Sequence, residues 1–151
     1  MTGSIPRDTN HREAILRDIA EFFKVLADEA RIQMLWLLFN HRELCVCDIV
    51  EALGITQSKA SRHLATLRHA GLVVDRKEAA WSYYSIRPAK NDVQTELLQA
   101  LRANLARHPS SGRVLRELHV WLDRKDRDAT CVPGAVCRSA SAPRRPRRAR
   151  S

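Results

Sequence analysis

The chain has 151 residues, 44% of them hydrophobic and 28% charged, which suits one soluble globular domain with or without a tail. Its formal net charge of +9 favours a polyanionic partner, but six arginines lie in the last fourteen residues, and without them the charge is only +3. No apolar run could span a bilayer and the first residues lack a secretory signal, so we expect a cytoplasmic protein with no membrane partner.

Two helices are predicted early in the chain, after residues 1–11, which we expect to be disordered. Apolar residues recur at helical spacing between His11 and Ala27. Asp28 is a suitable N-cap for the second helix, which is apolar on most sides and ends at Asn40 and His41. We therefore expect the second helix to be buried between other elements.

A helix-turn-helix follows. A short helix over about 47–53 is stopped by Gly54, and a second helix, capped by Thr56 or Ser58, reaches about residue 70. Two short helices joined by so tight a connection are typical of a helix-turn-helix. The positions of the second helix that we expect to face inward are Ala60, Leu64 and Leu67.

The chain then changes to strand periodicity. Residues 72–77 and 81–86 are rich in β-branched and aromatic residues and are separated by Glu78-Ala79-Ala80, which predicts a β-hairpin. A hairpin directly after a helix-turn-helix is the wing of a winged helix. After Pro88, the apolar spacing predicts a further amphipathic helix that ends near Leu105.

The end of the chain divides into a last helix and a tail. The segment 108–112 interrupts the helical pattern, and a final helix is predicted from about Gly112 to Arg124. From Lys125 onward the composition is polar and then rich in Arg, Pro, Ser and Ala. Such a composition cannot bury a core, so we expect residues 125–151 to be disordered.

The cysteines form two pairs. Cys45 and Cys47 lie at the start of the short helix, and Cys131 and Cys137 flank a Pro-Gly turn in the tail. Soft metal ions prefer thiolate ligands, and a one-residue spacer strains a disulfide between Cys45 and Cys47. Residues two apart on a regular helix point to nearly opposite sides. Both sulfurs can therefore reach one ion only if the backbone at this end of the helix is unwound or loop-like.

A ligand that prefers three thiolates needs one more cysteine besides Cys45 and Cys47. Either Cys131 or Cys137 could supply it, from the same subunit or from a second one. The alternatives are a redox disulfide across the Pro-Gly turn, or tail thiols without a role.

Polar and basic side chains occupy the first turns of the second helix of the helix-turn-helix. Residues at that end of a recognition helix contact base edges in the major groove, where Gln suits adenine, Arg suits guanine, and Ser or Lys can bind phosphates. The predicted DNA-binding residues are Gln57, Ser58, Lys59, Ser61, Arg62 and His63. On the wing, Arg76 and Lys77 are candidates for backbone contacts, or an ordinary pair of exposed charges.

Taken together, these segments resemble the ArsR/SmtB family of winged-helix metalloregulators. The resemblance rests on residues 23–31 (FKVLADEAR), 43–49 (ELCVCDI), 57–64 (QSKASRHL) and 71–73 (GLV). It implies a mostly α fold with a small β-hairpin, and a homodimer held by the first and last family helices. It also implies repression that ends when a metal or metalloid binds, and members with this cysteine motif sense arsenite and antimonite, or cadmium and lead.

The resemblance completes the expected organisation. We expect residues 12–108 to form the winged-helix DNA-binding and dimerisation domain, and residues 109–124 to form an additional helix. Residues 1–11 and 125–151 are expected to be disordered. The expected partners are double-stranded operator DNA and a second copy of the chain, and no organic cofactor is expected.

Two departures from the family pattern concern the ligands. The arsenite-type motif commonly carries a third cysteine three residues past the second, where this chain has Val50. Zinc-type relatives have Asp-x-His and a later His on the last helix, where this chain has Asp92-Val93-Gln94. A zinc site there is therefore not expected.

The leading hypothesis is a repressor of a metalloid-resistance operon that arsenite or antimonite releases from DNA. One alternative hypothesis is a repressor with the same fold whose inducer is cadmium or lead. Another is a redox-sensing repressor that acts through Cys131 and Cys137. A thiol oxidoreductase using Cys45 and Cys47 is disfavoured, because no Cys-x-x-Cys lies beside a βαβ pattern, and we expect no enzymatic activity.

Overall fold

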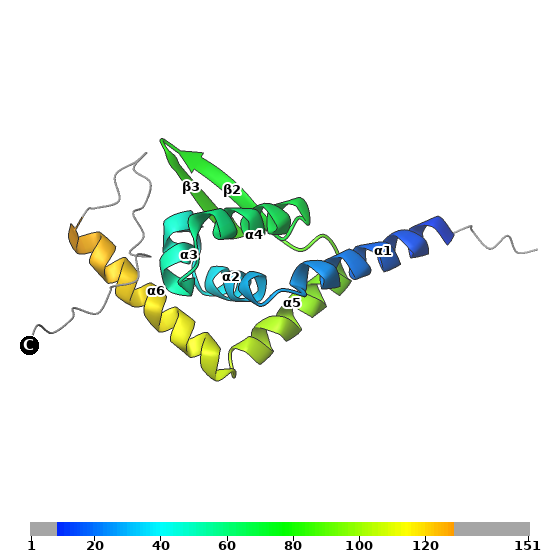
Figure 1. Cartoon of the computed structure of the whole chain (residues 1–151). Helices are drawn as coiled ribbons and strands as arrows, with labels where there is room; N and C mark the ends of the chain where they lie inside the picture. Colours follow the sequence, from blue (N-terminus) through cyan, green and yellow to red (C-terminus); the bar gives the residue numbers. More distant parts are fainter. Residues whose placement is uncertain (1–8, 129–151) are drawn as a thin grey trace, which may run out of the picture.

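The computed structural model describes residues 9–128, with side chains over residues 12–125. The described part of the chain is mostly helical, with one small antiparallel sheet (Figure 1). Its elements are α1 Thr9–Leu26, α2 Glu29–Asn40, β1 Leu44–Cys45, α3 Val46–Leu53, α4 Gln57–His69, β2 Val73–Glu78, β3 Trp81–Ile86, α5 Asp92–Leu105 and α6 Pro109–Asp128. This order confirms the predicted winged helix.

Side-chain caps set where α2 and α4 begin. The Asp28 carboxylate accepts a hydrogen bond from the Arg31 backbone N–H at 3.2 Å, which confirms the predicted cap of α2. Of the two caps considered for α4, Thr56 is the one used, because its hydroxyl accepts from the Lys59 N–H at 3.2 Å. Gly54 ends α3 in the left-handed conformation, with φ of 62°.

The core is centred on α2. Met34, Leu35 and Leu37 are fully buried, as the all-round apolar pattern of this helix predicted. The predicted inward face of α4 is confirmed, since Ala60, Leu64 and Leu67 are also fully buried. From α6, Val114 and Leu118 complete the same core.

The sheet has three strands in the order β1-β3-β2. The predicted hairpin is confirmed, with Ala79 and Ala80 as a two-residue turn between β2 and β3. The third strand was not predicted, because two residues are too few to show a period. In β1, Leu44 pairs with Tyr84 and Cys45 with Tyr83, so the cysteine motif is hydrogen-bonded to the wing.

Two helices extend further than the sequence pattern predicted. Helix α1 begins at Thr9, and α6 runs from Pro109 to Asp128, so residues 9–11 and 125–128, for which the sequence pattern predicted disorder, lie in helices in the structure. Proline is favoured in the first turn of a helix, because its missing N–H has no partner there in any case. At the other end, a side-chain contact of Lys125 with α3 holds α6 beyond its last apolar residues.

The arrangement places the wing and α4 together at one side of the molecule (Figure 1). Helix α6 packs along α3, and α1 projects from the body beside α5. No helix within residues 9–128 has both the length and the apolar composition needed to cross a membrane.

Candidate metal centre and nucleic-acid interface

Cys45 and Cys47 converge at the junction of β1 and α3. Cys45 is the last residue of the strand and the N-cap of the helix, with extended backbone angles of −82° and 166°, whereas Cys47 lies in the first helical turn. This change of conformation between them brings their sulfurs to 2.7 Å, although both side chains are almost completely buried. The helix start is thus non-helical at Cys45, the condition under which two thiols spaced this way can reach one ion.

A buried carboxylate adjoins the two thiols. Asp48 is 4% exposed, and its Oδ2 accepts a hydrogen bond from the Cys45 backbone N–H at 2.9 Å. Its Oδ1 accepts two more at 2.9 Å each, from the indole N–H of Trp121 and from the ammonium of Lys125. Helix α6 therefore closes over the start of α3 through two side chains that both bind one carboxylate.

Lys125 also contacts the thiol pair directly. Its Nζ lies 3.3 Å from Cys45 Sγ and 5.5 Å from the centroid of the Trp81 ring on β3. Burial acts to lower the pKa of Lys125, but the hydrogen bond and the charge of Asp48 outweigh it and raise that pKa above the ordinary value. The cation therefore stays charged beside the sulfurs.

The environment favours ionisation of one thiol. The hydrogen bond with Cys47 lowers the pKa of Cys45 below the usual value of a thiol, and the charge of Lys125 acts in the same direction. Burial and the charge of Asp48 oppose this shift without cancelling it. A thiolate is the form that binds metals and metalloids.

The donor set fits a thiophilic centre. Cys45 Sγ, Cys47 Sγ and a carboxylate oxygen of Asp48 all lie within 4.8 Å of one another, and all three residues are buried. Two adjacent sulfurs are the donors that soft or thiophilic ions select. The other two predicted ligands, Cys131 and Cys137, lie outside the described residues.

Sequence reasoning missed Asp48, Trp121 and Lys125 as part of this centre. Trp121 and Lys125 are 73 and 77 residues from Asp48 along the chain, and no local pattern links them to it. The one available signal was an acidic residue three positions after a helix N-cap, where it can accept from the cap backbone.

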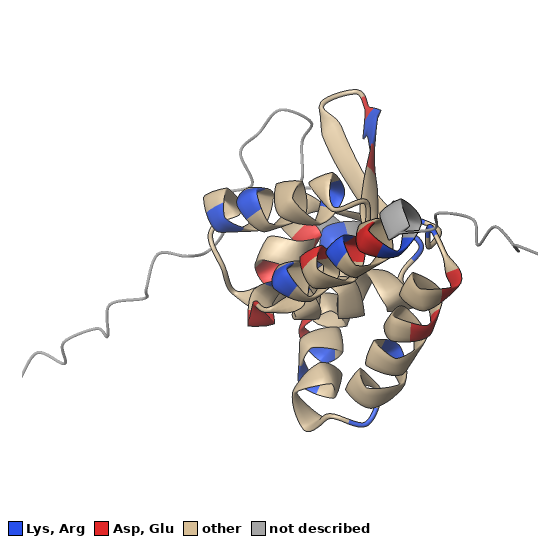
Figure 2. Ribbon diagram, turned by 90° about the vertical axis from the view of Figure 1, so that its right-hand side faces the viewer, with Lys and Arg blue, Asp and Glu red and all other residues tan. Residues whose placement is uncertain are grey.

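The first turns of α4 present most of the predicted DNA-binding residues to solvent. The exposed members are Gln57, Ser58, Lys59, Ser61 and Arg62. Neither Lys59 nor Arg62 makes an ion pair within the described part of the chain, so both charges are available to phosphates or bases. Lys and Arg recur along α4 in Figure 2.

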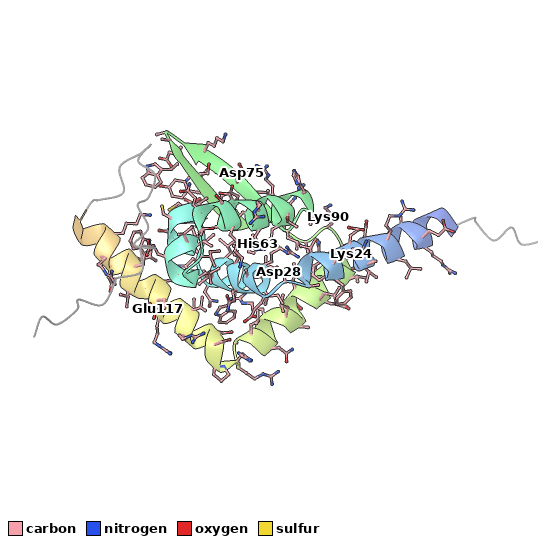
Figure 3. The ribbon with its side chains drawn as sticks, in the orientation of Figure 1. Lys24, Asp28, His63, Asp75, Lys90 and Glu117 are labelled. Atoms are coloured by element: carbon pink, nitrogen blue, oxygen red, sulfur yellow. The ribbon has the colours of Figure 1, made fainter. Side chains whose placement is uncertain are left out.

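His63 is placed differently from the other members of that set. Its side chain is only 14% exposed and lies against the junction of α1 and α2 (Figure 3). Its Nδ1 is 3.2 Å from Arg31 Nη1, and its Nε2 is 3.9 Å from an oxygen of Asp28. Burial lowers the pKa of His63, with the charge of Arg31 acting in the same direction and that of Asp28 against it.

The two basic residues of the wing also differ. The Arg76 guanidinium donates to the carboxylates of Glu43 and Glu78 and stacks on the Tyr83 ring at 4.9 Å. Lys77 is exposed and has no ion pair among the residues that the structure describes. Acidic and basic residues therefore adjoin on the wing, as Figure 2 shows.

Comparison with known proteins decides the family. The family model "Bacterial regulatory protein, arsR family" matches residues 28–74. The arsenical resistance operon repressor of Escherichia coli K12 is 43% identical over 103 residues, which are 61% of this chain and 88% of that repressor. The chain belongs to the ArsR family. It is accordingly a DNA-binding transcriptional repressor and not an enzyme.

Two further ArsR-family comparisons bear on the ligand and on assembly. A cadmium resistance regulatory protein, a CadC homolog of Staphylococcus aureus, is 38% identical over 69 residues, covering 46% of this chain and 57% of that protein. The homodimeric winged helix-turn-helix domain of Mb0332 from Mycobacterium bovis superposes with a TM-score of 0.53 at 30% identity, over 72% of this chain and 94% of that domain. The family thus includes proteins named for different metal resistances.

Within residues 9–128, one partly apolar face of the fold is left uncovered. A groove of about 460 Å³ runs between α1, the end of α4 and α5, and its wall includes Phe22, Val25 and Leu97. On the same helices, Leu16 is 68% and Phe23 54% exposed. Exposed apolar side chains beside a groove are typical of a protein interface.

Proposed function

We propose that this chain is a homodimeric repressor of a metalloid-resistance operon in the cytoplasm, and that arsenite or antimonite releases it from its operator by bonding to Cys45 and Cys47. The observation that carries the proposal is the pair of buried sulfurs 2.7 Å apart at the start of α3. A site of this kind on an ArsR-family repressor links a thiophilic ligand to the recognition helix, because α3 packs directly on α4.

The chemistry is a condensation without change of oxidation state. Arsenite is As(OH)₃ at neutral pH, and each thiol that bonds to arsenic loses its proton to a departing hydroxide, which leaves as water. Cys45 and Cys47 supply two As–S bonds and release two waters. We assign the third thiolate to Cys131 or Cys137, since arsenite prefers three sulfurs and Val50 replaces the third cysteine of the motif.

Two structural links can carry the change to the DNA-binding surface. Bonding both sulfurs to one atom fixes a new separation and angle between them, so β1 and the first turn of α3 must move relative to each other. Strand β1 is paired with β3 of the wing, and α3 packs on α4. Ligand binding then favours an arrangement of the wing and α4 that fits the operator less well.

The deciding experiment compares Cys45→Ser and Cys47→Ser with the unmodified chain in an operator gel shift titrated with arsenite. We expect both variants to bind the operator normally and to stay bound at arsenite concentrations that release the unmodified protein. Arg62→Ala is the matched control, since it should weaken operator binding and leave arsenite uptake unchanged. Normal release of the cysteine variants would show that the assignment of the site is wrong.

Sulfur counting tests the third thiolate. X-ray absorption on the arsenite-loaded protein should find three sulfurs around arsenic, and only two when Cys131 and Cys137 are both Ser. Three sulfurs in that double variant would exclude the tail. The same variant tests the redox-sensing alternative, because peroxide-driven release that depends on these cysteines would support it.

Cadmium or lead is the second candidate inducer. The carboxylate of Asp48 lies within 4.8 Å of both sulfurs, and divalent cations accept oxygen as well as sulfur donors. Side-by-side titrations of the operator complex with arsenite, antimonite, cadmium and lead separate the two candidates by the concentration needed for release.

A further inference from the structure

Asp48 is a potential oxygen ligand whose carboxylate already accepts three hydrogen bonds. Its Oδ2 accepts from the Cys45 backbone, and its Oδ1 accepts from Trp121 and Lys125, each at 2.9 Å. The residue is 4% exposed, so water cannot take over these hydrogen bonds. An ion that recruits Oδ1 of this carboxylate competes for it with the ammonium of Lys125.

We propose that Lys125 is a specificity-determining residue, which keeps Asp48 out of the ligand set and makes the thiol pair selective for trivalent metalloids over divalent cations. The inference rests on the proposed function of Cys45 and Cys47. It concerns which ligand the site binds, and not how ligand binding changes the affinity for DNA.

The two ligand classes make different demands on the carboxylate. A divalent soft cation held by thiolates alone still gains from an adjacent carboxylate donor, for which it competes with Lys125. Arsenite enters as a neutral molecule, bonds covalently to sulfur and does not need the carboxylate. The contact between Lys125 and Asp48 therefore opposes the divalent cation and leaves arsenite almost unaffected.

Charge adds to this competition. The Lys125 ammonium lies 3.3 Å from Cys45 Sγ, so a cation bound to that sulfur would lie close to a positive charge. Repulsion between like charges at such a distance is strong in a buried site, where water screens little. The position of Lys125 is in turn fixed by α6 and by the Trp81 ring of β3.

Direct binding to the reduced full-length protein without DNA tests the inference. Equilibrium dialysis against cadmium chloride or sodium arsenite, with the bound element measured by mass spectrometry, gives both affinities. Lys125→Met should bind cadmium at least about tenfold more tightly and change arsenite affinity less than about threefold. Lys125→Arg, which keeps the charge, should stay close to the unmodified protein.

Two further variants make the result specific. Arg124→Met removes an exposed positive charge from the same helix and should change neither affinity. Adding Asp48→Asn to Lys125→Met should abolish the gain in cadmium affinity, because the carboxylate is the donor that the gain depends on. Melting curves of each variant check folding, and Lys125→Gln replaces the Met variant if that one does not fold.

The outcomes separate the two proposals. An unmodified protein that fails to bind arsenite overturns the proposed function and the inference with it. A protein that binds arsenite, but whose ratio of cadmium to arsenite affinity is the same with and without Lys125, overturns the inference alone. A cadmium gain that persists without the Asp48 carboxylate also contradicts it.

Discussion

The two basic residues predicted to contact DNA from the wing differ in whether their charges are already paired within the protein. Arg76 and Lys77 are neighbours on β2 and look equivalent in sequence. The Arg76 guanidinium is shared between Glu43 and Glu78, and these hydrogen bonds raise the pKa of Arg76. Lys77 has no such partner among the described residues, so its ammonium can bind a phosphate without first breaking an ion pair.

Removing Lys77 should therefore weaken operator binding more than removing Arg76. We expect Lys77→Ala to lower affinity roughly threefold to tenfold near physiological salt, and to reduce the slope of log K against log salt by about one, the mark of one lost phosphate contact. Fluorescence anisotropy with labelled operator over a range of salt concentrations measures both quantities. Arg76→Ala is the matched variant, and a larger effect of Arg76→Ala would reverse the assignment.

His63 illustrates what residue type alone does not reveal. It lies in a run of polar residues on α4, and the sequence groups it with Lys59 and Arg62 as a base reader. In the structure its ring turns toward Asp28 and Arg31, and so connects α4 to the junction of α1 and α2. That contact joins residues more than thirty positions apart, which helical spacing within one segment does not encode.

At the scale of elements, α3 has only eight residues and depends on its ends. Its N-terminus is held by the Asp48 carboxylate on the Cys45 backbone, and its C-terminus by Gly54 at φ of 62°. A Cβ added at Gly54 meets no atom within 4 Å, so the backbone conformation alone sets the effect of a substitution. Gly54→Ala should cost about 1 kcal/mol of unfolding free energy, measured by urea denaturation.

Gly112 provides the opposite case on α6. It has ordinary helical angles, and a Cβ there would meet only the flexible end of Arg116 at 3.3 Å. Gly112→Ala should stabilise the protein by roughly 0.5 kcal/mol, since alanine favours the helix and restricts the unfolded chain. Equal effects of the two substitutions would mean that the left-handed conformation at Gly54 does not limit stability.

Helix boundaries could be predicted where a local signal exists. Asp28, Thr56 and Gly54 are caps whose chemistry acts within three or four residues, and all three lie where the sequence placed them. The strand β1 and the last turn of α6 had no such signal. Each depends on a partner distant in the chain, Tyr83 and Tyr84 for β1 and Asp48 for Lys125. The thiol pair was thus predictable from its motif, but the residues that surround it were not.

At the scale of the whole molecule, α1 and α5 expose apolar side chains to solvent in the single chain. Leu16 and Phe23 on α1 and Val93 on α5 are exposed, and the groove between these helices is partly apolar. Figure 1 shows α1 extending well beyond the body formed by the other described elements. A second copy related by a twofold axis would cover both helices at once, in keeping with the proposed homodimer.

Charge placed on that face should separate the dimer. Phe23→Glu puts a carboxylate into the interface twice by symmetry, and burial of an unpaired charge is strongly unfavourable, so we expect the dimer dissociation constant to rise at least tenfold. Analytical ultracentrifugation measures it, and operator affinity should fall together with dimer content. Val120→Glu on α6 is the control, because Val120 is equally apolar and exposed but lies outside the face of α1 and α5. Dissociation by Val120→Glu alone would place the dimer contact on α6 instead.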